Sequence, residues 1–144
     1  MKWQAMAADK VRAKRHLPEY RTKYGKMFQG FCEDILAATP LTKLKGKIDL
    51  IFTSPPFPLN TKKKYGNLQG EEYITWLASL APIFSEYLAP RGSVVIELGN
   101  AWVPGSPTMS TLPIKTLLRF LEAGDLHLCE EFICFNPAKL PSPA

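Results

Sequence analysis

The chain has 144 residues, of which 46% are hydrophobic, so it can form one compact domain with its own core but has no room for two. Its formal net charge is +5, and most of the basic excess precedes residue 27. No stretch reaches the ~20 apolar residues of a membrane span, and the first residues lack the apolar run of a secretory signal, so we expect a cytoplasmic protein with no membrane partner.

Residues 1–26 form a basic N-terminal segment, which we distinguish from the catalytic-motif region expected over residues 27–144. Its acidic residues are Asp9 and Glu19. Its basic residues are Lys2, Lys10, Arg12, Lys14, Arg15, Arg21, Lys23 and Lys26. Such a segment is typical of proteins that contact a polyanion, most commonly nucleic acid. A solvated and partly frayed N-terminus accounts for the charge pattern equally well.

Hydrophobic patterning predicts alternating strands and helices after this segment. A short strand over residues 27–29 leads through a glycine turn into a short helix over residues 33–38. Residues 48–52 are apolar except for Asp49 and do not alternate strictly, which is typical of a strand covered on both faces. A helix is expected over residues 71–90, with Pro82 kinking or breaking it. Its apolar stripe consists of Tyr73, Ile74, Leu77, Leu80, Ala81, Phe84 and Leu88.

The remaining elements continue the alternation. They are a turn at residues 91–92, a strand over residues 93–99, a helix over residues 111–123 that Gly124 ends, and a strand over residues 126–135. This order predicts a doubly wound, mainly parallel α/β sheet. Ligands of such sheets bind beyond the carboxyl ends of the strands, and residues 54–57 and 97–102 follow two of those ends.

The cysteines and histidines do not indicate a metal site. Cys32, Cys129 and Cys134 are odd in number and lack zinc-ligand spacing, and His16 and His127 form no cluster. We therefore expect reduced, mostly buried thiols and no bound metal.

The expected strand over residues 48–52 ends in Thr53-Ser54-Pro55-Pro56-Phe57. Each proline restricts the residue before it to extended conformations, so this turn should be rigid. It offers the Ser54 hydroxyl and an outward-pointing carbonyl as acceptors for an amino group, and Phe57 offers a flat ring. These features fit the exocyclic amine of a base taken out of a DNA duplex. Alternatively, the prolines only end the strand and Phe57 packs inward.

The stretch TSPPF resembles motif IV of the amino-methyltransferases that act on DNA. Its Ser form is similar to that of the cytosine-N(4) enzymes, whereas an Asp form is commoner among adenine enzymes. Between about residue 17 and residue 144 the chain resembles the PvuII-type cytosine-N(4) DNA methyltransferases. The stretches that carry this resemblance are LPEYRTKYGKMFQG, SPPFPLNTKKKYGNLQGEEYITWL, RGSVVIELGNAW and FICFNPAKLPSP.

The resemblance implies an incomplete Rossmann-like fold and S-adenosylmethionine-dependent methylation of cytosine N(4) in double-stranded DNA, as part of a restriction–modification system. It implies that Ser54 and the Pro55 carbonyl hold the amine, that Pro56 fixes the turn and that Phe57 stacks on the base. Glu97 would take up the proton lost or orient Ser54. Alternatively, Glu97 is a polar strand-end residue satisfied by a backbone donor.

The resemblance also implies contacts outside the turn. Gly30 and Glu33, together with Ser54 and Pro55, would bind the cofactor. Lys62, Lys63, Lys64 and Lys139 would contact DNA, although a solvated loop explains the first three lysines equally well. Residues 136–143 resemble motif VIII, which lines the base pocket.

Two departures from the family pattern affect the cofactor site. No two glycines are separated by a single residue, so the glycine-rich turn near the methionine part of the cofactor is absent. Phe31 follows Gly30 where the family usually has an aspartate. Because that turn follows the catalytic motif in the permuted order of this family, we expect the N-terminal half of a longer enzyme, which alone binds cofactor poorly and is inactive.

Three further expectations follow from the partial match. The chain should need its missing half or self-associate, with Trp76, Trp102 and residues 133–135 exposed. A catalytically inactive remnant that at most binds nucleic acid remains an alternative function. An adenine-N(6) methyltransferase is the other alternative.

Overall fold

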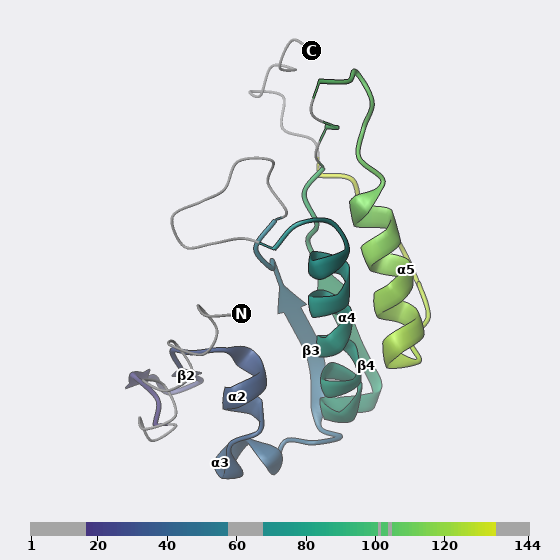
Figure 1. Ribbon diagram of the computed structural model, residues 1–144. Helices are drawn as coiled ribbons and strands as arrows, with labels where there is room; N and C mark the ends of the chain where they lie inside the picture. The colour runs from purple at the N-terminus through teal and green to yellow at the C-terminus, as the bar shows by residue number, and fades with distance from the viewer. Residues whose placement is uncertain (1–16, 58–67, 101, 104, 135–144) are drawn as a thin grey trace. The chain divides into compact units, whose positions relative to one another are not determined.

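The computed structural model describes residues 17–57, 68–100, 102–103 and 105–134, which are coloured in Figure 1. By its contacts the chain divides into two compact units, Met1–Lys45 and Gly46–Ala144. The boundary predicted after residue 26 separates a basic segment from the rest of the chain by its charge, not by its contacts, and it stays a prediction.

The first unit begins with an antiparallel hairpin. Its strands are β1 (Tyr20–Arg21) and β2 (Lys26–Met27). The turn between them is closed by a backbone hydrogen bond from Thr22 to Gly25 (2.8 Å), and the Gly25 N–H donates to the Thr22 hydroxyl (2.9 Å). The strand expected over residues 27–29 therefore lies one residue earlier and is shorter.

Two short helices follow the hairpin. The helix expected over residues 33–38 is present as α2 (Cys32–Leu36), and α3 (Thr39–Thr42) was not expected. A proline in the first turn of α3 costs no helical hydrogen bond there. Between β2 and α2, Gly30 has a φ of 150°, a conformation that side-chain-bearing residues rarely adopt.

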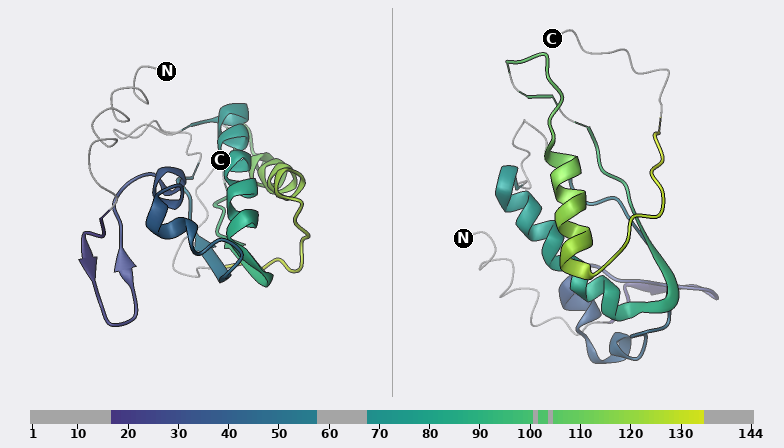
Figure 2. Two further views of the ribbon diagram at one scale, coloured as in Figure 1. Left: turned by 90° about the horizontal axis from the view of Figure 1, so that it is seen from below. Right: turned by 90° about the vertical axis from the view of Figure 1, so that its right-hand side faces the viewer.

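The second unit contains the predicted alternation of strands and helices. Its elements are β3 (Ile48–Thr53), α4 (Gly70–Tyr87), β4 (Leu88–Ile96) and α5 (Leu112–Gly124). The strands β3 and β4 pair in parallel, as expected. Both helices lie on the same side of this strand pair (Figures 1 and 2).

The core of the second unit is built on the apolar stripe of α4. The residues of α4 that it buries are Tyr73, Ile74, Leu77, Leu80, Ala81, Phe84 and Tyr87. From α5, Phe120 is buried with its ring centroid 6.0 Å from that of Phe84. The helix continues through Pro82, whose side chain lies on the exposed side, so the expected break does not occur.

The junction between α4 and β4 differs from the prediction. The helix ends at Tyr87, and Leu88 pairs with Ile48 as the first residue of β4. The next register pair is Leu50 with Ser93, so the expected turn at residues 91–92 is an irregularity inside the strand. Pairing of Leu88 with Ile48 therefore makes residues that the sequence pattern assigned to helix and turn part of β4.

The end of α5 also differs from the prediction. Gly124 lies inside the helix, and Asp125 ends it in the left-handed conformation with a φ of 50°. A Cβ on Gly124 would lie 3.0 Å from that of Ala81, and the Ser85 hydroxyl donates to the Gly124 carbonyl (2.6 Å). Gly124 therefore allows close packing of α5 on α4, and it is not the residue that ends the helix.

The third strand, expected over residues 126–135, is absent from residues 126–134; Phe135 lies outside the described residues. The pattern of this segment is compatible with a strand, but a strand forms only where it gains a ladder partner. The sheets described pair β1 with β2 and β3 with β4. Ile133 is exposed here as expected, and Trp102 is exposed too, whereas Trp76 is half-buried with its ring 5.8 Å from that of Tyr73.

One face of the β3–β4 pair carries exposed apolar side chains. Leu50 is 57% exposed and Phe52 is 68% exposed, and Val95, the register partner of Phe52, is also exposed. Their neighbours Ile51 and Val94, which point to the opposite face, are less exposed. We refer to Leu50, Phe52 and Val95 as the open sheet face.

Candidate active site

The carboxyl ends of β3 and β4 lie side by side. Thr53 is the register partner of Ile96, and the Glu97 N–H donates to the Thr53 carbonyl (2.9 Å). Ser54 and Glu97 therefore leave the sheet from neighbouring positions at the same edge. This is the edge where ligands of parallel α/β sheets bind.

The turn after β3 buries one of its residues and leaves the neighbouring residues at least partly exposed. Pro55 is buried, whereas Ser54 and Pro56 are exposed and Phe57 is half-buried. In the part of the chain that the structure describes, the Ser54 hydroxyl has no hydrogen-bond partner. The buried proline therefore anchors a turn whose hydroxyl can accept a hydrogen bond from a ligand.

Gly99 is a residue of this site that sequence reasoning missed. A Cβ built on Gly99 would lie 3.1 Å from both Cγ and Cδ2 of Phe57. The ring of Phe57 thus packs against the backbone at Gly99, and its half-buried state leaves part of the ring uncovered. Gly99, as the last residue of the strand predicted over residues 93–99, is the signal that could have pointed to a close backbone approach.

Glu97 is exposed at the end of the neighbouring strand. Its backbone N–H continues the ladder to Thr53. Among the described residues no donor satisfies its carboxylate, so the alternative in which a backbone donor binds the side chain is not observed there. The carboxylate is available to a ligand at the strand ends.

The residues expected to bind the cofactor are divided between the two units. Gly30 and Glu33 belong to the first unit and are not among the residues that β3 and β4 bring together. The Cys32 thiol donates to the Glu33 carboxylate (3.3 Å). Local burial of the sulfur, which is partly shielded although the residue as a whole is exposed, raises the pKa of Cys32 to about 11, and the Glu33 charge adds to this shift.

The remaining predicted site residues fall outside the described part of the chain. They are Lys62, Lys63, Lys64, Lys139 and the stretch 136–143. Within the described ranges no group of three or more acidic, histidine or cysteine side chains could hold a metal ion. Within the same ranges no helix has the length and apolarity to cross a membrane.

The expectation of mostly buried thiols was wrong. Cys32, Cys129 and Cys134 are all exposed and all free of disulfides. Cys32 lies on a helix of five residues that buries none of them. The other two lie in the segment over residues 126–134, which does not join a sheet and so does not bury alternate side chains.

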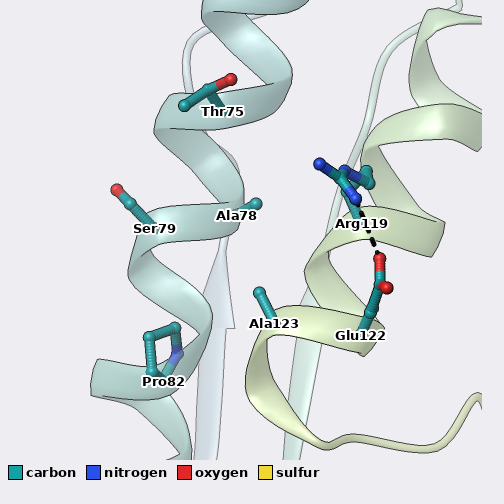
Figure 3. A pocket seen from close by; sticks show the side chains of 7 residues that line it. All are labelled: Thr75, Ala78, Ser79, Pro82, Arg119, Glu122 and Ala123. Carbon is teal, nitrogen blue, oxygen red and sulfur yellow. Dashed lines mark hydrogen bonds and ion pairs between the residues drawn. The ribbon is translucent and has the colours of Figure 1, made fainter.

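A surface pocket of about 340 Å³ lies between α4 and α5 (Figure 3). Its lining residues are Thr75, Ala78, Ser79, Pro82, Arg119, Glu122 and Ala123. Arg119 and Glu122 form an ion pair (3.1 Å) across one turn of α5. None of the predicted site residues lines this pocket, and its two charged side chains are paired with each other.

Comparison with known proteins supplies the family context. No family model matches the chain. The chain is 40% identical over 126 residues to the Type II methyltransferase M.PvuII of Proteus hauseri, a match that covers 88% of this chain and 36% of that protein. A solved structure of the PvuII DNA methyltransferase, described as cytosine-N4-specific, matches with a TM-score of 0.71 at 40% identity and covers 88% of this chain and 43% of that chain.

The chain thus spans well under half the length of the proteins it matches. The match confirms the expected Rossmann-like methyltransferase fold for the shared part, with an incomplete sheet. Over most of its length, this chain is similar to part of a cytosine-N4-specific DNA methyltransferase of the PvuII type.

Proposed function

We propose that this chain provides the catalytic-motif part of a DNA methyltransferase of a restriction–modification system, which methylates the N(4) amino group of cytosine in double-stranded DNA. The observation that carries the proposal is the turn at residues 54–57, placed beside Glu97 in a chain 40% identical to a protein of that specificity. An enzyme of this kind acts on cellular DNA, which places it in the cytoplasm.

Ser54 and Pro55 act on the amino group of the target base. The lone pair of this nitrogen is delocalised into the cytosine ring, so the nitrogen is a weak nucleophile. The Ser54 hydroxyl and the Pro55 carbonyl accept hydrogen bonds from the amine, which localises the lone pair and orients it. The gain comes from positioning and electrostatics, and no covalent intermediate with the protein is needed.

Phe57 and Pro56 hold the base that carries the amine. An extruded base is stabilised when its ring stacks on an aromatic side chain. The packing of Phe57 against Gly99 supports this role, because a ring fixed on one side loses little conformational freedom when a base stacks on the other. Pro56 limits the backbone freedom of the turn that carries Phe57.

Glu97 takes up the proton that the amine loses on methylation. Two observations support this role. The Glu97 side chain is exposed, and Glu97 follows β4 at the same sheet edge where Ser54 follows β3. Orientation of Ser54 by the same carboxylate is the second possibility. Replacement of Glu97 by Gln separates them, since an amide can orient a hydroxyl but cannot accept the proton.

S-adenosylmethionine, when bound, supplies a methyl group attached to a positively charged sulfur. The residues of the first unit fit the adenosine part of this molecule, because the Gly30 turn brings backbone close without a side chain and Glu33 offers a carboxylate for hydroxyl groups. No glycine-rich turn for the methionine part occurs in this sequence. We therefore infer that this chain alone binds the cofactor poorly, is inactive, and acts together with a complementary part of the enzyme.

The decisive experiment replaces the matched region of M.PvuII with residues 17–144 of this chain. Nucleosides from DNA treated with this chimera are then analysed by mass spectrometry. We expect N(4)-methylcytosine, and a loss of about 10²- to 10³-fold in rate for Ser54→Ala, as for removal of one preorganised hydrogen-bonding group. Ser93→Ala is the matched control, since Ser93 is an exposed serine on β4 away from the strand end, and its rate should not change.

Each other outcome has a defined meaning. N(6)-methyladenine in place of N(4)-methylcytosine would move the proposal to the adenine enzymes. A folded chimera that binds cofactor and DNA but methylates neither base would favour the inactive remnant. Micromolar binding of S-adenosylmethionine by the 144-residue chain alone, measured by calorimetry, would contradict the inferred need for a complementary part.

A further inference from the structure

The hairpin β1–β2 is a concentrated source of positive charge. Arg21, Lys23 and Lys26 are exposed on it. No acidic residue occurs in the sequence between Glu19 and Glu33. In the described ranges none of the three cations has a carboxylate partner.

The pairing within the hairpin places like charges opposite each other. Arg21 is the register partner of Lys26. Like charges directly opposite on neighbouring strands destabilise the pair, so this arrangement does not serve the stability of a hairpin with two residues in each strand. A polyanion bound across both strands removes the repulsion.

The turn of the hairpin holds these cations in a defined geometry. The Thr22 hydroxyl accepts hydrogen bonds from the backbone of both Tyr24 (3.3 Å) and Gly25 (2.9 Å). Lys23 lies with Nζ 5.0 Å from the ring centroid of Tyr24. A cationic loop ordered before binding loses less conformational entropy when it meets its ligand.

Exposed phenol groups accompany the charges. Tyr24 is 87% exposed, and Tyr20 is also exposed. Tyrosine hydroxyls and basic side chains together make up a large part of protein contacts to the DNA backbone. Donors of these two kinds on one hairpin fit a row of phosphates better than they fit a single small anion.

We propose that the β1–β2 hairpin is a DNA-backbone contact surface in which Arg21, Lys23 and Lys26 bind phosphates and the Tyr24 hydroxyl donates to a phosphate oxygen. The inference rests on the proposed function for its partner, double-stranded DNA. It assigns DNA contact to residues of the first unit, in addition to the turn at residues 54–57 in the second unit. The contact is independent of base sequence, because the groups involved read phosphates and not base edges.

The test measures binding of a fluorescently labelled duplex to the 144-residue chain by anisotropy over a salt series. The hairpin variant carries Arg21→Gln, Lys23→Gln and Lys26→Gln. Its matched control carries Lys47→Gln, Arg91→Gln and Lys115→Gln, which removes the same charge from exposed positions of the second unit. Each lost phosphate contact lowers the slope of log K against log salt by about 0.9, so the hairpin variant should lose roughly 2 to 3 in slope and about 10²-fold in affinity near 0.1 M salt.

The outcomes separate this inference from the proposed function. An equal loss in the two variants would assign the affinity to net charge and overturn the hairpin surface while leaving DNA as the partner. The absence of any duplex binding by the unaltered chain would overturn the hairpin surface but not the proposed function, which the nucleoside analysis of the chimera tests separately. The same loss with two duplexes of unrelated sequence would support backbone contact, whereas a loss confined to one sequence would overturn it.

A second measurement does not depend on folding of the variants. Lysines of the unaltered chain are acetylated with and without the duplex, and the modified sites are quantified by mass spectrometry. We expect the duplex to protect Lys23 and Lys26 and to leave Lys47 and Lys115 reactive. Unchanged acetylation of Lys23 and Lys26 at saturating duplex would overturn the proposal.

Discussion

Replacement of Leu50 and Phe52 by threonine should weaken self-association of the 144-residue chain. These two residues form most of the open sheet face, at 57% and 68% exposure. Full burial of such side chains contributes about 1.5–3 kcal/mol each, so the exposed parts still offer roughly 1–2 kcal/mol per residue to a covering surface. Threonine has the β-branched shape that suits a strand, and it removes most of this gain.

The expected effect is large enough to measure by sedimentation velocity over a range of concentrations. A joint loss of about 2–4 kcal/mol corresponds to an association constant lower by roughly 30- to 1000-fold. Ile114→Gln with Leu118→Gln is the matched control, since these residues of α5 are 54% and 59% exposed on a helix that satisfies its own backbone. A monomeric unaltered chain with cooperative unfolding, or an equal effect of the control, would refute the reasoning.

Two further predictions concern stability and are measured by unfolding in the background with threonine at residues 50 and 52. Gly92→Ala should destabilise the second unit by about 1–3 kcal/mol, because its Cβ would lie 2.6 Å from the Ile48 carbonyl oxygen; an unchanged denaturation midpoint would contradict this close contact. Tyr73→Phe should be neutral or stabilising by about 1 kcal/mol, because the Tyr73 hydroxyl is buried without a hydrogen-bond partner. Burial raises the pKa of Tyr73 from 10.0 to about 12, so the free energy of unfolding should be unaffected by this group below pH 10 and should fall as the pH rises from 10 to about 12. The phenylalanine variant should lack this alkaline loss of stability. The same loss in both proteins would contradict its assignment to Tyr73.

The local sequence pattern was sufficient to predict an element where the pattern alone decides which of its side chains share a face. The apolar stripe of α4 was predicted residue by residue up to Phe84, because a period of 3.6 places those side chains on one face whatever that face packs against. The strand β3 was predicted at its observed position because a short, largely apolar run before turn residues is compatible with a strand. The expected cover on both of its faces was wrong, since Leu50 and Phe52 are exposed. Parallel pairing of β3 and β4 then followed from the helix between them.

Prediction failed where a partner element decides the outcome. Leu88 continues the helical stripe in sequence, yet pairing with Ile48 makes it part of β4. Residues 126–134 have a pattern compatible with a strand but no ladder in the described structure. Gly124 was assigned to the helix stop by a local rule, although its role is contact with Ala81 in another helix. Such contacts are long-range, so a single sequence does not encode them in any local window.

In the candidate site, too, local features could be predicted from the sequence and contacts between distant residues could not. Ser54 and its two prolines could be proposed as site residues from local chemistry, because restriction of the backbone by proline is a property of neighbouring residues. The role of Gly99 was not identified, because it depends on a ring 42 positions earlier in the chain, that of Phe57. When a site is built from the ends of two strands, local sequence can therefore predict the residues of each turn but not the contacts between the two turns.

The strand-end site and the hairpin, in the roles proposed for them, meet two different physical requirements of base modification. Extrusion of a base from the duplex costs a few kcal/mol. In the proposed function, the two hydrogen bonds and the stacked ring at Ser54, Pro55 and Phe57 orient the base and add little to affinity. Phosphate contacts at the hairpin can offset that cost because their energy does not depend on base identity. It follows that weakening the hairpin should lower DNA affinity without changing which base is methylated, whereas changes at Ser54 should lower the rate at unchanged DNA affinity.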